Sequence, residues 1–159
     1  KEEELKDLKI ALAQAKEEFR IEGIVTGALY STYQRDRIEK ICDELGLKTF
    51  APLWHLDQES EMREVLKKGF KFILTAVAGD GLTKDWLGRE ITSEDIDNLV
   101  KLNNKIGLNI AGEGGEFESL ITSGPGFSKD INIVSSKVVM ENKCTGELII
   151  SEAKLVPKK

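Results

Sequence analysis

The sequence is poor in histidine, cysteine and proline, with one histidine, two cysteines and three prolines among its 159 residues. The lone His55 and the widely separated Cys42 and Cys144 form no ligand cluster, which excludes a structural zinc site. Two distant cysteines also give no disulfide scaffold, so we expect a reducing compartment, the cytoplasm. No apolar run approaches the roughly 20 residues that cross a bilayer, and no basic-then-apolar signal pattern stands at the start. These absences predict a cytoplasmic protein without a membrane partner.

The charge balance is acidic, with 28 acidic against 23 basic residues and a net charge of -5. A protein that coats duplex nucleic acid is strongly basic, so we expect no nucleic-acid partner. Apolar residues make up 40% of the chain, and this fraction excludes intrinsic disorder. A chain of this length forms one domain or a domain and a half and can bury a substantial core.

Apolar residues recur at helical spacing in four segments, and each segment leads through a glycine into a short apolar run. Helix–glycine–strand units in series are typical of α/β folds with a largely parallel sheet, which is the fold class we predict. Each glycine is expected to end its helix in a left-handed turn. The four glycines are Gly23, Gly46, Gly69 and Gly107, and the runs that follow them are residues 24–25, 47–53, 70–78 and 108–111.

The chain changes character after residue 118. A break at residues 124–126 precedes two strand-like runs, residues 131–140 and 147–156, joined through a turn near residues 144–146. This pattern predicts a small antiparallel β-hairpin region appended to the sheet. We therefore divide the chain into residues 1–118, an α/β part that ends in an acidic glycine-rich loop, and residues 119–159, a C-terminal β region.

Ligands of parallel α/β sheets bind beyond the carboxyl ends of the strands, so four loops are candidates for a site. These loops are expected to face one edge of the sheet. They comprise residues 27–35, 53–57, 79–82 and 112–118. The sequence has neither the glycine motif of dinucleotide folds nor that of P-loop enzymes, and no serine nucleophile motif.

The loop of residues 112–118 reads GEGGEFE and is the least ordinary of the four. Clustered carboxylates repel one another unless a cation relieves them, and glycines let a ligand approach the backbone. The plain alternative is a glycine turn with solvated acids. We expect a binding site here, formed by Glu113, Gly114, Gly115, Glu116 and Glu118.

The loop of residues 27–35 has two interpretations. Backbone amides at Gly27 and Ala28, together with the Arg35 guanidinium, could surround a phosphate group. Alternatively, Arg35 pairs with Asp36 or Glu39 on a solvated helix, and the spacing alone favours this second interpretation.

Several motifs stand together in order along the chain: Gly27-Ala28, Tyr33-Gln34-Arg35, Pro52-Leu53-Trp54, Trp86-Leu87-Gly88-Arg89 and the GEGGEFE loop. As a set they resemble the diphthine–ammonia ligase family, a branch of the N-type ATP pyrophosphatases in the adenine nucleotide alpha hydrolase superfamily. The resemblance implies a Rossmann-like, HUP-type parallel sheet, incomplete in this chain. Residues 1–118 would then be the C-terminal part of the nucleotide-binding domain.

The resemblance also implies an activity. The family joins ammonia to the carboxylate of diphthine on translation elongation factor two, after ATP has activated that carboxylate as an acyl-adenylate. ATP and Mg²⁺ are therefore expected, without a protein metal site. We assign the nucleotide to Gly27, Ala28, Gln34 and Arg35. The trimethylammonium group of diphthine is assigned to the acidic loop, where carboxylates and aromatic rings attract cations.

Two departures from the family qualify the resemblance. Its SGGKDS-type phosphate loop does not occur in these 159 residues, and residues 124–127 read GPGF where the family has Pro-Leu-Phe. The chain thus resembles the C-terminal two-thirds of such a ligase, and we expect this chain alone to be inactive. A related ligase on another substrate and a non-catalytic binding module both stay open, as does a homo-oligomer.

Overall fold

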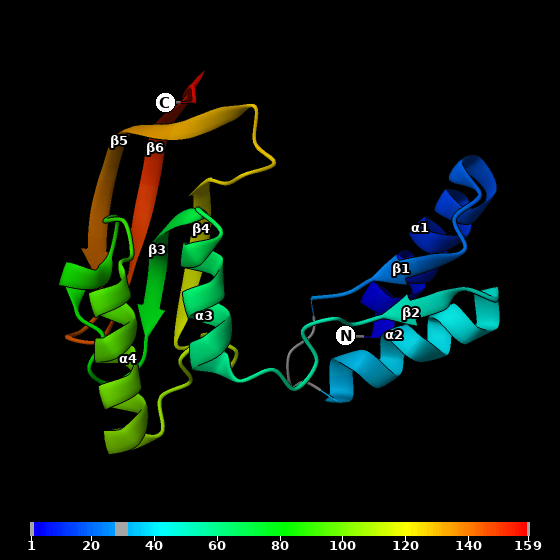
Figure 1. Ribbon diagram of the computed structural model, residues 1–159, viewed down its shortest axis with the longest axis horizontal. Coiled ribbons are helices and arrows are strands. Elements are labelled where there is room, and N and C mark those ends of the chain that lie inside the picture. The colour runs from blue at the N-terminus through cyan, green and yellow to red at the C-terminus, as the bar shows by residue number, and fades with distance from the viewer. Residues whose placement is uncertain (1, 28–31, 159) are drawn as a thin grey trace. The chain divides into compact units, whose positions relative to one another are not determined.

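The computed structural model describes residues 2–27 and 32–158, with the backbone alone for residues 2, 3, 33 and 34. The chain forms two compact units, Lys1–Leu56 and Asp57–Lys159 (Figure 1). One holds a parallel strand pair and the other a four-stranded antiparallel sheet, so the predicted mixed α/β class with an added hairpin is confirmed. Within the described ranges, no helix has the length and hydropathy that crossing a membrane requires.

The first unit alternates helices and strands, as the sequence predicts. Its strands β1 and β2 pair in parallel, with Gly23 opposite Lys48. Helix α2 buries Ile41 and Cys42, which lie on its predicted apolar stripe. The elements are α1 (Glu2–Phe19), β1 (Gly23–Val25), α2 (Thr32–Leu45) and β2 (Lys48–Phe50).

Three of the four predicted helix-ending glycines have the left-handed backbone. Their φ values are 62° at Gly46, 82° at Gly69 and 75° at Gly107. The prediction for Gly23 is wrong, because Arg20 takes the left-handed conformation after α1, with φ 53°. A Cβ at Gly23 would lie 2.6 Å from the carbonyl oxygen of Lys48, so this glycine permits close strand pairing instead.

Gly46→Ala is expected to lower the free energy of unfolding by about 1 kcal/mol, because Cβ is disfavoured at positive φ. An added Cβ at Gly46 would have only the Lys16 Nζ atom within 4 Å, at 3.5 Å, so backbone strain dominates. Gly126 is the matched control, since its added Cβ would meet nothing within 4 Å and its φ is not positive. Chemical denaturation of both variants measures the difference, and equal stabilities would contradict the assignment of Gly46.

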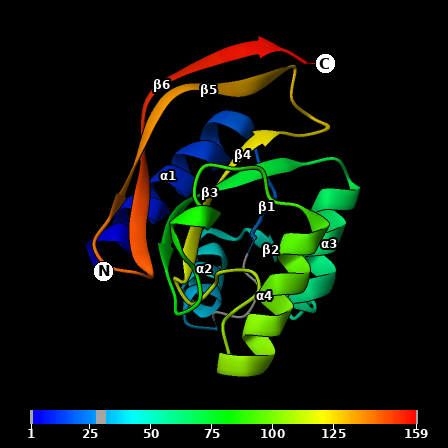
Figure 2. The same cartoon turned by 90° about the vertical axis from the view of Figure 1, so that its left-hand side faces the viewer.

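The second unit packs two helices on one face of its sheet. Helices α3 and α4 lie side by side over β3 and β4 (Figure 1 and Figure 2). The core between helices and sheet includes Met62, Ile96, Leu99, Leu74 and Phe117. The sheet has the order β4-β3-β6-β5. The elements are α3 (Gln58–Lys67), β3 (Lys71–Ala78), the 3-10 helix η1 (Lys84–Trp86), α4 (Ser93–Ile106), β4 (Phe117–Ser123), β5 (Lys129–Met140) and β6 (Thr145–Pro157).

Two of the strands predicted for the parallel sheet, those of residues 70–78 and 108–111, do not form part of such a sheet in the structure. Strand β3 pairs antiparallel with both β4 and β6, so the third unit of the series does not extend the β1–β2 pair. Residues 108–111 form no strand, although Leu108 and Ile110 are buried as expected. The backbone amides of this segment bond to side chains rather than to a strand: Ile110 N donates to Gln58 Oε1 at 2.9 Å, and Asn109 N donates to Glu116 Oε1 at 3.1 Å.

The predicted C-terminal hairpin is present. Strands β5 and β6 pair over most of their length, and β3 joins β6 only at residues 145–147. The remainder of the hairpin therefore extends as a two-stranded ribbon (Figure 2). The compact units divide after Leu56, whereas our sequence division falls after residue 118, inside β4. A functional division at residue 118 stays a prediction.

Candidate functional site

Two of the four candidate loops meet in the second unit. Ala78 N, at the end of β3, donates to Glu116 O at 2.7 Å, which joins the strand end to the acidic loop. Gly79 follows directly, and a Cβ there would lie 3.2 Å from the Glu116 Cβ. A hollow of about 250 Å³ lies at this junction, lined by Gly79, Asp80, Ile106, Gly107, Leu108 and Glu116.

The start of the acidic loop is organised by Asn109. Its Oδ1 accepts hydrogen bonds from Ala111 N at 3.0 Å and Glu113 N at 3.2 Å. Its carbonyl oxygen accepts from Gly112 N at 3.2 Å. An asparagine that bonds its own backbone in this way fixes a turn, so the loop has a defined shape. The sequence analysis did not single out Asn109, although an asparagine shortly before a glycine is a turn signal.

Glu116 has two unlike carboxylate oxygens. Its Oε1 accepts a hydrogen bond from the backbone N–H of Asn109. Its Oε2 is buried and has no hydrogen-bond partner among the described residues. The side chain as a whole is half-buried. One oxygen thus holds the loop together, and the other has no hydrogen-bond partner in the described part of the chain.

The three glycines of the loop have separate structural causes. Gly112 has φ 77°, and a Cβ there would lie 2.7 Å from the ring of Phe117. At Gly114 a Cβ would lie 2.6 Å from Glu116 Oε1. Gly115 has φ 85°, and its surroundings are open to 4 Å. The positive φ values account for Gly112 and Gly115, whereas close contact with Glu116 accounts for Gly114. Of the three, only Gly115 would leave an added Cβ without a neighbour within 4 Å among the described residues.

Glu113 is exposed, and its charge acts on a carboxylate that the sequence did not single out, Glu61 of α3. Burial raises the pKa of Glu61, and the charge of Glu113 raises it further. Glu61 Oε2 is buried without a hydrogen-bond partner among the described residues. The position of Glu61 in the sequence could have indicated its burial. It is adjacent to the buried Met62 and one turn beyond Gln58, on the helix face that packs inward.

Glu118 lies on strand β4 rather than in the loop. Its register partner is Ala76 of β3, whose other partner is Glu147 of β6. Two glutamates thus flank a small residue on the sheet. The three predicted carboxylates have different neighbours: Glu61 for Glu113, the Asn109 amide for Glu116, and Ala76 for Glu118. Their joint action on one ligand stays a prediction.

Glu113→Gln is expected to lower the pKa of Glu61, because it removes a negative charge that disfavours ionisation. A folded-state pKa above the ordinary 4.5 means that ionised Glu61 destabilises the fold above that pKa. This penalty disappears as the pH falls through the folded pKa. Carbon NMR titration of Glu61 measures the shift. Glu64→Gln is the control, since Glu64 is exposed and pairs with Lys67 and Lys68; an equal shift in both variants would refute the action of Glu113 on Glu61.

In the first unit, the predicted phosphate ligand Arg35 is engaged within the chain. Its guanidinium lies 4.5 Å from the ring centroid of Trp54, a cation–π contact. Its Nε lies 3.2 Å from Glu39 Oε1, without hydrogen-bond geometry, and its Nη2 lies 3.6 Å from Asp36. The structure thus shows the ion pairs of the second interpretation. The Trp54 contact also brings the loops of residues 27–35 and 53–57 together.

The other predicted nucleotide residues are only partly within the described residues. Gly27 is described, and among the described residues an added Cβ there would meet nothing within 4 Å. Ala28 lies outside the described residues, as does the side chain of Gln34. In the neighbouring loop His55 has φ 61° and its ring centroid lies 4.7 Å from that of Trp54.

Asp57 begins the second unit as the cap of α3. Its Oδ1 accepts from Ser60 N at 2.8 Å, and this bond lowers the pKa of Asp57. The described residues contain no group of three or more His, Cys, Asp or Glu side chains that could hold a metal ion.

Comparison with known families gives two matches that follow one another along the chain. A model described as the diphthamide synthase N-terminal domain matches residues 1–49, and one described as the diphthamide synthase C-terminal domain matches residues 57–156. The division between them coincides with the division between the two compact units after Leu56.

Individual relatives give the same result. A diphthine–ammonia ligase of Schizosaccharomyces pombe is 41% identical over 138 residues, which are 87% of this chain and 22% of that protein. The ligase of Mus musculus is 38% identical and that of Homo sapiens 37%, each over 141 residues. These residues are 88% of this chain and 52% of each mammalian protein. The chain thus spans about half the length of the mammalian relatives and about a fifth of the yeast one.

Proposed function

The chain belongs to the diphthamide synthase family, and from this premise we propose that the complete protein is an ATP-dependent diphthine–ammonia ligase. One observation carries the proposal: both family models match in order, and their division coincides with that of the structure. The sequence resemblance, which was drawn from motifs alone, leads to the same family.

The proposed reaction converts a carboxylate into an amide in two steps. An oxygen of the diphthine carboxylate attacks the α-phosphorus of ATP, and the bond to pyrophosphate breaks. Ammonia then attacks the acyl carbon, the bond to AMP breaks, and the nitrogen loses one proton. ATP is a substrate here, and Mg²⁺ is proposed to enter bound to its phosphates, since the described residues offer no metal cluster.

We assign the two substrates to different units. The nucleotide is placed at the strand end of β1, with Gly27, Ala28, Gln34 and Arg35. The open surroundings of Gly27 support this choice, because a backbone without a side chain admits close approach of a ligand. For Arg35 to bind phosphate, it has to exchange its contacts with Asp36 and Glu39 for the ligand.

The acceptor is placed at the acidic loop, with Glu113, Gly114, Gly115, Glu116 and Glu118. The unpartnered, buried Oε2 of Glu116 supports this choice, because a buried carboxylate oxygen without a partner is costly until a ligand supplies one. The trimethylammonium group of diphthine is cationic, so this group and the acidic loop have opposite charge. The proposed protein substrate is translation elongation factor two, and the two free cysteines Cys42 and Cys144 fit a reducing cytoplasm.

The nucleotide product tests the proposal. The complete protein is mixed with ATP, magnesium, ammonium and elongation factor two that carries diphthine. AMP and pyrophosphate are expected in equal amounts, and only when the acceptor and ammonium are both present. Formation of ADP would exclude adenylation, and AMP formation without the elongation factor would point to another acceptor.

A further inference from the structure

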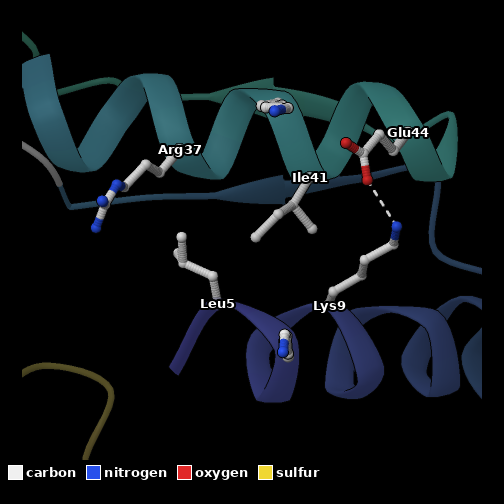
Figure 3. A pocket seen from close by; sticks show the side chains of 7 residues that line it. Leu5, Lys9, Arg37, Ile41 and Glu44 are labelled. Carbon is white, nitrogen blue, oxygen red and sulfur yellow. Dashed lines mark hydrogen bonds and ion pairs between the residues drawn. The ribbon is translucent and has the colours of Figure 1, made fainter. Parts of the chain in front are cut away.

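A groove of about 390 Å³ lies between α1 and α2 in the first unit, and none of the residues assigned above is among the described residues that line it. Side chains of both helices project into it, among them Leu5 and Lys9 of α1 and Arg37, Ile41 and Glu44 of α2 (Figure 3). Among the described residues, its lining consists of Leu5, Lys6, Lys9, Arg37, Lys40, Ile41 and Glu44. Its volume is typical of pockets that hold small molecules.

Positive charge is concentrated in this groove. Helices α1 and α2 contain six basic residues, and four of them line it. The same helices contain eight acidic residues with described side chains, and Glu44 alone lines it. The chain as a whole has a net charge of -5, so this groove is basic in an acidic protein.

Helical spacing produces this concentration. Lys6 and Lys9 are three residues apart on α1, and Arg37 and Lys40 are three apart on α2, so each pair lies on one face of its helix. Lys9 Nζ bonds Glu44 Oε2 at 2.6 Å across the groove, and this bond lowers the pKa of Glu44. One of the four cations, Lys9, thus bonds the carboxylate of the lining, and Lys6 and Lys40 add two further positive charges.

The floor of the groove is apolar. Leu5 and Ile41 extend toward one another from the two helices (Figure 3), and Ile41 is buried while Leu5 is half-buried. Cations of the Lys and Arg type bind phosphate groups, and an apolar floor supports the uncharged part of a ligand. We propose that this groove binds a small molecule that carries two or more phosphate groups, with the phosphates among the basic side chains.

Titration calorimetry of this chain with inorganic pyrophosphate, without metal, tests the proposal. Saturable binding is expected, with an affinity at least about tenfold lower in Lys6→Glu/Lys40→Glu, because each contact of a cation with phosphate is charge-assisted. The control is Lys101→Glu/Lys105→Glu on α4, which makes the same change in net charge at exposed positions and should bind like the wild type. Should the first variant not fold, Lys6→Gln/Lys40→Gln replaces it, with a smaller expected loss.

Further measurements distinguish a nucleotide from an inorganic phosphate ligand, and the groove from the proposed nucleotide site. ATP and pyrophosphate are compared in Arg35→Ala, so that the proposed nucleotide site contributes least. Tighter binding of ATP that is lost in Lys6→Glu/Lys40→Glu would identify a nucleotide, and equal binding of the two would identify an inorganic ligand. Arg35→Ala alters the proposed nucleotide site and should leave pyrophosphate binding at the groove unchanged. The proposal is overturned if wild type shows no saturable binding, or if the Lys6/Lys40 variants bind pyrophosphate as well as wild type does.

Discussion

In the complete protein, Glu116→Gln is expected to raise the concentration of diphthine acceptor needed for half-maximal rate roughly 30-fold, about 2 kcal/mol. The substitution removes the negative charge of the unpartnered Oε2 that the acceptor is proposed to approach. Glutamine keeps a side-chain oxygen that can accept the hydrogen bond from the backbone N–H of Asn109, so the loop should retain its shape. The affinity for ATP should change little, because the nucleotide is assigned to the other unit.

Glu152→Gln is the control for this prediction, since Glu152 is an exposed carboxylate in a surface pair with Lys154 at 2.9 Å. Its acceptor requirement should match that of the wild type. Steady-state rates at varied acceptor and ATP concentrations give both quantities. If Glu116→Gln instead weakens ATP binding, the acidic loop belongs to the nucleotide side and the acceptor assignment is wrong.

Asp95→Ala is expected to lower the free energy of unfolding of the second unit by about 3 kcal/mol. The side chain is 8% exposed and binds Arg89 through two hydrogen bonds of 2.7 Å. It also accepts from Thr92 N at 2.8 Å at the start of α4. Removing the carboxylate leaves the guanidinium and a helix-end amide without this acceptor, and denaturation curves measure the loss.

Asp97→Ala is the matched control for Asp95. Asp97 lies two residues further on the same helix and also pairs with an arginine, Arg63, but its side chain is 52% exposed. Surface pairs contribute between zero and about 1 kcal/mol, so this variant should lose far less. Equal losses in the two variants would contradict the role given to burial.

The stabilisation by Asp95 should also depend on pH. Hydrogen bonds from Arg89 hold the pKa of Asp95 below its ordinary value of 3.8. For a lowered carboxyl pKa, the stabilisation is complete above the unfolded value and is lost as the pH falls through the folded pKa. The difference in stability between wild type and Asp95→Ala should therefore shrink in acid below pH 3.8.

Local features of the fold followed from sequence, whereas strand direction did not. The apolar stripes placed all four helices, and glycine placed the left-handed ends at Gly46, Gly69 and Gly107. The run of residues 70–78 predicted a buried strand, but a buried run carries no information on whether its partners are parallel. The direction of β3 depends on β4 and β6, which lie more than 35 residues further along the chain.

For residues 108–111, the failed strand prediction has a different cause. Burial of Leu108 and Ile110 was correctly expected, and burial usually requires that the backbone bond within a sheet. Here the acceptors are side chains, Gln58 for Ile110 N and Glu116 for Asn109 N. Gln58 lies 52 residues before Ile110, so no local pattern could indicate this bond.

The candidate site was predicted in its parts. Within each unit two of the candidate loops lie together, through Arg35 and Trp54 in one and Ala78 and Glu116 in the other, although this pairing by unit was not predicted. The shared edge for all four loops stays a prediction. Glu61 was missed because a glutamate in the first turn of a helix is ordinarily a solvated residue, whereas Glu61 Oε2 is buried in the structure.

The fate of the ammonia nitrogen tests the central claim most directly. The complete protein is incubated with ATP, isotopically labelled ammonium and elongation factor two that carries diphthine, and the modified histidine peptide is then analysed by mass spectrometry. The account predicts one labelled nitrogen, as an amide, in that side chain, with one AMP formed for each nitrogen incorporated. An unlabelled, unchanged diphthine in the presence of ATP consumption would contradict it.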